Sequence, residues 1–325
     1  MDFLTICVVL FVLTVVVAAV RLGQGDCDLT LQWFEKFGKS AAELKGKIVW
    51  ITGASSGIGE GLAYELAAAG CRLVLSARRE DLLEEVKKKC CVTGNLREDD
   101  ILVLPLDLLA YDTHSNAVET VIKYFKKIDI LVNNAGRSQR AMCEDTSLSI
   151  DKQVLELNFL GAVSVTKAVL PQFRRQGHGH FVVTSSLAGK LGAPGLGSYS
   201  SSKHALQGWF DCLRIEAFTK NILVTMVCPG SVYSQSLMHA FTGKENESLG
   251  VEMKPGEHRM STDRCSHLIG VAIANQVDEV WVAVQPELTY VYLFQYLPGI
   301  ARWLGKRLGQ KRVQAVQQGK SNLHA

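Results

Sequence analysis

Between residues 47 and 284, short apolar runs alternate with helical stretches, and this alternation constrains the fold more than any other feature. The runs occupy residues 48–51, 72–76, 101–106, 128–132, 180–184, 223–228 and 280–284. Most are continuous in Val, Ile and Leu, as strands covered on both faces must be. The intervening segments, such as 60–69 and 80–89, have helical spacing. The pattern predicts an α/β fold with a doubly wound parallel sheet and right-handed crossovers.

No internal repeat or linker rich in Pro, Gly and Ser divides this segment, so we predict a single domain over residues 47–285. An N-terminal anchor (1–21), a linker (22–46) and a C-terminal tail (286–325) complete the chain. With 47% apolar and 21% charged residues, the composition is that of a globular protein with a core. A net charge of +3 without a long basic run argues against a nucleic-acid partner.

The predicted anchor contains an apolar run of eighteen residues, 3–20, softened only by Thr5 and Thr14. At ~1.5 Å per residue, such a helix just spans a hydrocarbon core of ~30 Å. The alternative is a signal peptide cleaved near Ala18-Ala19. The run is longer than an ordinary signal-peptide core and no basic residue precedes it. We therefore predict an uncleaved membrane anchor.

The charges that flank the anchor indicate its orientation. Arg21, Lys36 and Lys39 follow the run, which places the main domain on the cytosolic side by the positive-inside rule. The only glycosylation sequon begins at Asn246, and a sugar there would indicate the opposite side. The membrane side therefore stays open at this point.

The cysteine pattern argues against a metal centre. There are nine cysteines, an odd number, without a C-x-x-C pair, and Cys90 and Cys91 are adjacent. We predict reduced, mostly buried thiols and no metal site.

A glycine-rich turn follows the first predicted strand and leads directly into a helix. Its spacing is G-x-x-x-G-x-G, which lets the backbone approach a pyrophosphate that the free N–H groups of the helix can bind. A tight strand–helix connection is the alternative, but the position after the first strand of an α/β domain favours a dinucleotide. The residues predicted to contact it are Thr52, Gly53, Ser55, Ser56, Gly57, Ile58 and Gly59.

The end of the second predicted strand indicates which dinucleotide binds. An NAD site usually has an acid there, whereas this strand is followed by Arg78 and Arg79. A guanidinium can pair with a 2′-phosphate, so the sequence predicts NADP(H), although both arginines could instead form a solvated helix start. Asp107, after the third strand, could meet the adenine edge or cap the next helix.

Further motifs follow the glycine-rich turn in a fixed order. Asn133-Asn134-Ala135-Gly136 ends the fourth run, Ser186 follows the fifth, and Tyr199 precedes Lys203 by four residues. In order and spacing, these motifs resemble those of the short-chain dehydrogenase/reductase family over roughly residues 47–284. The resemblance implies a Rossmann-type oxidoreductase and, through the family's anchored microsomal members, a location in the endoplasmic reticulum membrane. It also implies that Asn133 braces the sheet, whereas Asn134, Ala135 and Gly136 line the nucleotide site.

Tyr199 and Lys203 would share one face of a helix. A phenol has a pKa of ~10, and the ammonium of Lys203 together with an oxidised nicotinamide would lower it. Tyr199 could then exchange a proton with a substrate oxygen that Ser186 holds. The resemblance implies these roles, with Lys203 also binding the ribose and Asn158 completing a water-linked relay. Asn158 could otherwise only bend its helix.

The segment after the sixth strand departs from the family's pattern. The family has Pro-Gly and then a Thr four residues past the Gly, where this chain has Ser234. The hydroxyl that would meet the nicotinamide is kept and the methyl is lost. The cofactor contacts predicted here are Pro229, Gly230, Val232 and Ser234. Residues 234–263 are polar and rich in Gly, which predicts a mobile substrate lid.

The tail combines an aromatic segment, 290–298, with a basic amphipathic segment, 301–313. This combination suits a membrane interface, or a helix packed on the domain or on the partner in a homodimer. Pro298-Gly299 breaks the run, which argues against a second span. On a bilayer, the enzyme would take retinoids, steroids or other lipophilic carbonyls from the lipid.

We therefore expect an NADPH-dependent carbonyl reductase that acts on small lipophilic substrates. An oxidative retinol or steroid dehydrogenase and a 3-keto lipid reductase are alternatives within the same chemistry. A non-catalytic membrane scaffold is the alternative of a different class, and the joint presence of Asn158, Ser186, Tyr199 and Lys203 argues against it.

Overall fold

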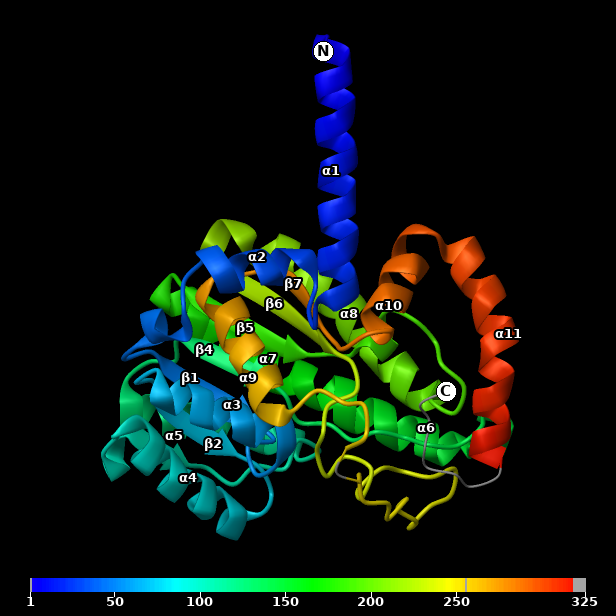
Figure 1. Ribbon diagram of the computed structural model, residues 1–325. Coiled ribbons are helices and arrows are strands. Elements are labelled where there is room, and N and C mark those ends of the chain that lie inside the picture. The colour runs from blue at the N-terminus through cyan, green and yellow to red at the C-terminus, as the bar shows by residue number, and fades with distance from the viewer. Residues whose placement is uncertain (1, 255, 318–325) are drawn as a thin grey trace.

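The computed structural model describes residues 2–254 and 256–317, and it contains one parallel seven-stranded sheet (Figure 1). The strand order is β3-β2-β1-β4-β5-β6-β7, so the order reverses between β1 and β4. This confirms the predicted doubly wound sheet. The strands are β1 (Ile48–Thr52), β2 (Arg72–Ser76), β3 (Ile101–Val103), β4 (Ile130–Asn133), β5 (Gly179–Thr184), β6 (Ile222–Pro229) and β7 (Glu279–Val282).

All seven predicted strands are present, and β3 differs most from its prediction. It has three residues instead of six, because the chain leaves the regular ladder after Val103. Its extension still bonds to the neighbouring segment, since the N–H groups of Leu104 and Leu106 donate to the carbonyls of Leu75 and Ala77. The apolar run therefore predicted the length of the extended segment, but it did not indicate where the regular strand pairing ends.

Helices cover both faces of the sheet, which explains why the strand runs are apolar throughout. They are α3 (Gly57–Ala68), α4 (Glu80–Gly94), α5 (His114–Phe125), α6 (Leu148–Leu155), α7 (Gly161–Gln176), α8 (Gly197–Ala217) and α9 (Thr262–Ala274). Alternate strand residues enter two separate cores. Ile51 of β1 packs in the core with α3, α4 and α9, whereas Trp50 packs in the core with α5, α7 and α8.

The helix 148–176 continues from α6 through a π-helical turn, Glu156–Leu160, into α7. Among the described residues, it is the one helix of at least eighteen residues that is apolar enough to cross a membrane. Val165, Val169 and Phe173 of this helix are fully buried against the sheet. Its apolar composition is therefore explained by its place in the core.

The predicted anchor forms helix α1 (Phe3–Gln24), which projects away from the domain (Figure 1). Its large apolar side chains lie exposed, with Phe3 82% and Phe11 70% accessible. Its segment Phe3–Thr14 is apolar, and a projecting apolar helix agrees with a membrane anchor. The anchor itself stays a prediction.

The segment 22–46, which was predicted as a linker, packs on the domain over much of its length. Cys27 pairs with Val282 at the edge of β7, and Asp28 accepts from the N–H groups of Trp281 and Leu31 at 2.6 and 3.0 Å. Helix α2 (Leu29–Phe37) follows. Arg264 of α9 forms ion pairs with Asp26 and Glu35. These long-range contacts leave no local periodicity in the sequence.

The tail forms helices α10 (Glu287–Tyr296) and α11 (Pro298–Gln317), and the chain turns sharply between them as Pro298-Gly299 predicted. Leu288 and Val291 of α10 are buried in a small core with Trp281. Helix α10 therefore packs on the domain, and contact of the tail with a membrane stays a prediction. Residues 318–325 lie outside the described part of the chain.

All nine cysteines are free, as predicted. Cys27, Cys71, Cys90, Cys228 and Cys265 are buried, and they contribute to the apolar cores as small hydrophobic side chains.

Gly179 at the start of β5 provides a test of core packing. A Cβ at this position would lie 2.1 Å from the ring of Phe173, and that ring is held by Phe181 at a centroid distance of 4.7 Å. Gly179→Ala should therefore lower the free energy of unfolding by at least ~2 kcal/mol. Gly208→Ala is the matched control, because its Cβ would meet nothing within 4 Å and Ala favours the helix by up to ~1 kcal/mol. Equal unfolding midpoints for the two variants in thermal denaturation would contradict this packing.

Candidate active site

One cavity of about 1170 Å³ opens at the carboxyl ends of the strands. The ends of β1, β2, β4, β5 and β6 all contribute residues to its wall, and the strand order reverses among them. Open α/β sheets bind ligands in the crevice at such a reversal. Each predicted cofactor and catalytic residue except Gly59 and Asn158 lines this cavity.

The glycine-rich turn at the end of β1 is held in a shape that only glycines allow. Gly53 and Gly57 have φ of 69° and 61°, in the left-handed region. A Cβ at Gly59 would lie 2.3 Å from the Gly53 carbonyl oxygen, so Gly59 acts through packing behind the turn. Asn134 fixes the turn from β4, because its Nδ2 donates to the carbonyl of Thr52 at 3.1 Å.

The turn leaves the start of α3 available to an anion. Ser56 is the N-cap residue, and its side chain makes no capping hydrogen bond. The first N–H groups of a helix then need another acceptor, and the helix dipole favours a negative one. The residues present therefore fit the pyrophosphate of a dinucleotide.

Positive side chains gather at this end of the cavity. Arg79 donates to the hydroxyls of Ser55 and Ser56 at 3.3 and 3.5 Å, and Arg78 lines the same wall. Burial and the charges of Arg79, Arg137 and Arg78 lower the pKa of His239. The two predicted arginines therefore lie beside the turn, exposed at the start of α4, and their pairing with a 2′-phosphate stays a prediction.

Asp107 lies in the cavity wall but does not cap helix α5, which begins at His114. Its carboxylate accepts from the N–H of Leu109 at 3.1 Å and so stabilises the turn after β3. The helix-capping alternative is therefore wrong, and contact with an adenine stays a prediction.

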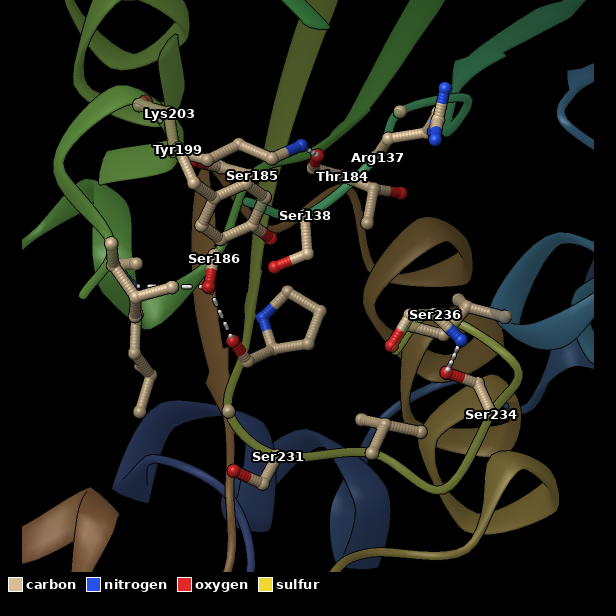
Figure 2. Close-up of a pocket in the computed structure, with 18 of the residues that line it drawn as sticks. Arg137, Ser138, Thr184, Ser185, Ser186, Tyr199, Lys203, Ser231, Ser234 and Ser236 are labelled. Atoms are coloured by element: carbon tan, nitrogen blue, oxygen red, sulfur yellow. Dashed lines mark hydrogen bonds between the residues drawn. The ribbon is translucent and has the colours of Figure 1, made fainter. Parts of the chain in front are cut away.

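Tyr199 and Lys203 lie one turn apart on α8, with the Lys203 Nζ 5.6 Å from the centre of the Tyr199 ring. The ammonium donates to the Thr184 carbonyl at the end of β5, at 2.8 Å. The Ser186 hydroxyl donates to the Pro229 carbonyl and accepts from the Ala188 N–H, at 3.2 and 3.1 Å. Figure 2 shows the Tyr199 and Ser186 side chains at the same wall of the cavity, with Ser138 beside them.

Burial controls the protonation of both groups. It raises the pKa of Tyr199, a rise opposed by the hydrogen bond with Ser186 and by the charge of Arg140. It lowers the pKa of Lys203 to about 8. Lys203 was expected to lower the pKa of Tyr199. Among the effects of the protein itself, however, burial has the largest influence on this pKa and raises it. The resting phenol is therefore neutral and suited to donating a proton.

Asn158 lies in the π-helical turn between α6 and α7, with 1% of its surface accessible. Its Oδ1 accepts from the Arg137 N–H at 2.8 Å, and its Nδ2 donates to the Arg137 carbonyl and to the Ser202 hydroxyl. The side chain bonds to the loop after β4 and to α8, not to its own helix. Its contribution to a water-linked relay stays a prediction.

The Asn133–Gly136 motif divides as expected between sheet and cavity. Asn133 is buried and its Nδ2 donates to the Thr166 hydroxyl of α7 at 2.9 Å, which braces β4. Asn134, Ala135 and Gly136 line the cavity. A Cβ on Gly136 would lie 3.0 Å from the Asn158 Oδ1, so this glycine allows the close approach of the loop to the π-helical turn that carries Asn158.

The segment after β6 also lies in the cavity wall, including Pro229, Gly230, Val232 and Ser234. Glu287 of α10 accepts from the N–H and the hydroxyl of Ser231 at 2.8 and 2.6 Å, and so ties this segment to the tail. The Ser234 hydroxyl accepts from the Ser236 N–H at 3.3 Å. Its predicted contact with a nicotinamide carboxamide remains to be tested.

Among the cavity residues that were not predicted from the sequence, Arg137, Ser138 and Arg140 follow closely after the Asn-Asn-Ala-Gly motif. The Ser138 hydroxyl accepts from Arg140 and points into the space in front of Tyr199 (Figure 2). Arg137 stacks on Phe241 at 3.8 Å and donates to the His239 carbonyl, which connects β4 with the predicted lid. Their position just after the motif could have suggested that they lie near the cavity. The sequence could not show which way their side chains point.

Comparison with known proteins agrees with this geometry. The family described as short chain dehydrogenase matches residues 47–245. Dehydrogenase/reductase SDR family member 7 of Homo sapiens is 44% identical over 97% of this chain and 93% of its own. The protein of the same name from Mus musculus is 43% identical over 92% and 88%.

Solved structures show the same fold. An alcohol dehydrogenase from the archaeon Thermococcus sibiricus, complexed with 5-hydroxy-NADP, aligns with a TM-score of 0.64 and 26% identity over 74% of this chain and 99% of its own. A short chain dehydrogenase/reductase from Burkholderia phymatum, in complex with NAD, aligns with a TM-score of 0.66 and 22% identity over 78% and 94%. The second likeness concerns the fold alone.

Proposed function

Because the chain belongs to the short-chain dehydrogenase/reductase family and is thus an oxidoreductase acting on alcohols or carbonyls, we propose that it reduces lipophilic carbonyls with NADPH. The proposal rests mainly on the placement of the Tyr199 and Ser186 side chains at one wall of the cavity that also contains the glycine-rich turn.

Each side chain of the site has a separate role in the reaction. A bound nicotinamide dinucleotide supplies the hydride. Ser186 donates a hydrogen bond to the carbonyl oxygen and stabilises its growing negative charge. Tyr199 transfers its phenolic proton to the same oxygen, which completes the alcohol. Lys203 holds α8 to β5 through Thr184 and offers its ammonium to the ribose.

Burial raises the pKa of Tyr199, so the phenol is protonated at neutral pH and can donate its proton in the reductive direction. The ratio of reduced to oxidised cofactor in the compartment decides which direction prevails. Oxidation of retinols or steroid alcohols is the reverse of the same steps and needs the phenolate. Reduction of 3-keto lipids would use the reductive steps on another substrate.

The wall of the cavity near the tail supports a lipophilic substrate. Apolar side chains line this part, and α10 and α11 close one side of it. Gly305 allows α11 to approach α10, because a Cβ there would lie 2.6 Å from the Tyr290 hydroxyl oxygen. The apolar lining residues are Leu187, Leu191, Leu196, Phe294 and Leu308. Retinoids and steroid ketones have the matching chemistry.

We further propose that α1 anchors the enzyme in the endoplasmic reticulum membrane with the domain in the cytosol. The apolar helix and the basic residues Arg21, Lys36 and Lys39 after it support this orientation. Asn246 lies in an exposed loop, so its glycosylation state in cells reports which side the domain occupies.

Turnover by the Tyr199→Phe variant tests the proposed chemistry. Purified full-length protein is assayed with NADPH and a panel of retinal, steroid ketones and small quinones. Loss of the proton donor should lower kcat/KM by ~10²-fold or more. Tyr124→Phe is the matched control, since Tyr124 lies on α5 away from the cavity lining and its hydroxyl donates to the Asp99 carbonyl. Equal turnover by wild type and Tyr199→Phe would reject the mechanism.

The cofactor preference is tested by Arg78→Asp. If Arg78 pairs with the 2′-phosphate, the variant should bind NADPH at least ~10-fold more weakly while NADH binding changes little, because a charged hydrogen bond contributes ~1.5–3 kcal/mol. Lys88→Asp on α4 makes the same change of charge away from the cavity and controls for long-range electrostatics. A similar loss of affinity for both nucleotides would remove the proposed role.

A further inference from the structure

Exposed apolar side chains gather around the base of α1. Trp33 and Phe37 on α2 are 61% and 58% accessible, and Tyr296, Leu297 and Ile300 at the α10–α11 turn are 52–69% accessible. Helix α1 leaves the domain in contact with both α2 and α10. Figure 1 shows α2 and the α10–α11 turn at the end of the domain from which α1 projects. We call these five side chains the basal patch.

Helix α2 is fixed firmly to the domain, so the exposure of its aromatic residues is not a sign of loose packing. Leu31 is fully buried, and Asp28 caps the helix through the Leu31 N–H. Trp33 and Phe37 lie on the outer side with their rings 4.6 Å apart, and the Lys36 Nζ lies 5.3 Å from the Phe37 ring. Aromatic rings beside a lysine are typical of the interface between hydrocarbon and water.

The two halves of the basal patch belong to one rigid surface. The Tyr292 hydroxyl of α10 accepts from the Leu29 N–H at the start of α2, at 3.0 Å. Tyr292 also packs on Trp281 of β7 and stacks on Tyr296, with ring centres 4.9 and 6.2 Å apart. A movement of the tail that separated the two halves of the patch would therefore break these contacts.

A lipid bilayer fits this surface better than a protein partner. Helix α1 spans 22 residues, or about 33 Å, close to the ~30 Å of a hydrocarbon core. The apolar side chains that the structure describes on this helix are exposed around it, and hydrocarbon would cover them on every side. Since α1 ends at Gln24, directly before α2, the patch lies at the depth where the headgroups begin.

We propose that the basal patch rests in the interfacial layer of the bilayer and forms a second membrane contact beside α1. The inference rests on the proposed anchoring by α1 and goes beyond it, because an anchor alone leaves the domain free to tumble on its tether. Docking by the patch holds α10 at the lipid surface. Tyr290 and Phe294 of the same helix line the cavity, so docking also brings the substrate chamber to the bilayer.

Quenching of tryptophan fluorescence by brominated lipid tests this contact. The full-length protein is reconstituted into phosphatidylcholine vesicles with plain or brominated acyl chains, and Trp33→Phe is compared with wild type. If Trp33 lies in the interface, removing it should lower the intensity quenched by bromine at least twofold. The remaining quenching reports the other tryptophans, including the exposed Trp303.

A charge variant tests the patch as a whole. Phe37→Glu combined with Leu297→Glu should reduce the quenching of Trp33, because two carboxylates would be driven out of the interface. Val92→Glu is the control, since Val92 is 84% accessible on α4, which packs by β2 and β3 at the other edge of the sheet.

Flotation of the vesicles separates this inference from the anchor. Protein that floats and shows Trp33-dependent quenching supports the patch. Protein that floats while wild type and Trp33→Phe are quenched equally retains the anchor and overturns the patch. Protein that does not float with the vesicles overturns both the anchor and the patch.

Discussion

The hydrogen bond between the Lys203 ammonium and the Thr184 carbonyl is the constraint on which the site depends. It joins α8 to the end of β5, and because Tyr199 lies one turn earlier on α8, it also sets the phenol against Ser186. The bond carries a cost, since burial lowers the pKa of Lys203 to about 8. Burial favours the neutral form of both side chains, so the site holds a protonated phenol next to a lysine whose pKa is about 8. That is the property that proton transfer to or from a substrate oxygen requires.

The sheet brings the rest of the site to this pair. Strands β1 and β4 are neighbours in the sheet, although the end of β1 at Thr52 and the start of β4 at Ile130 are 78 positions apart in the chain. Asn134, which directly follows β4, binds the glycine-rich turn that follows β1. Asn158 does the same between its π-helical turn, α8 and the loop after β4. The Asn134 amide donates to the glycine-rich turn, whereas the Asn158 amide both accepts and donates inside the protein. The cavity is therefore preorganised by side chains that do not react.

Much of this was predictable, because parallel strands and their terminal motifs leave local signals. The seven apolar runs, the glycine-rich turn and the Tyr199 to Lys203 spacing each identified an element or a site correctly placed at the cavity. The packing of Asp28 on Trp281 was not predictable, because a contact across 253 positions has no periodicity. The raised pKa of Tyr199 was missed for a related reason: it depends on burial, which the whole fold determines. Side-chain direction at Ser138 likewise needs the structure.

The central claim is that Tyr199 changes protonation in response to the charges around it. The most direct measurement is the near-ultraviolet absorbance of tyrosinate during a pH titration, recorded for wild type and Tyr199→Phe with and without NADP⁺. We expect NADP⁺ to move the ionisation of one phenol to lower pH in wild type, because a positive nicotinamide beside Lys203 favours the phenolate. The same addition should leave the titration of Tyr199→Phe unchanged. Identical responses of the two proteins to NADP⁺ would show that Tyr199 does not respond to the cofactor's charge.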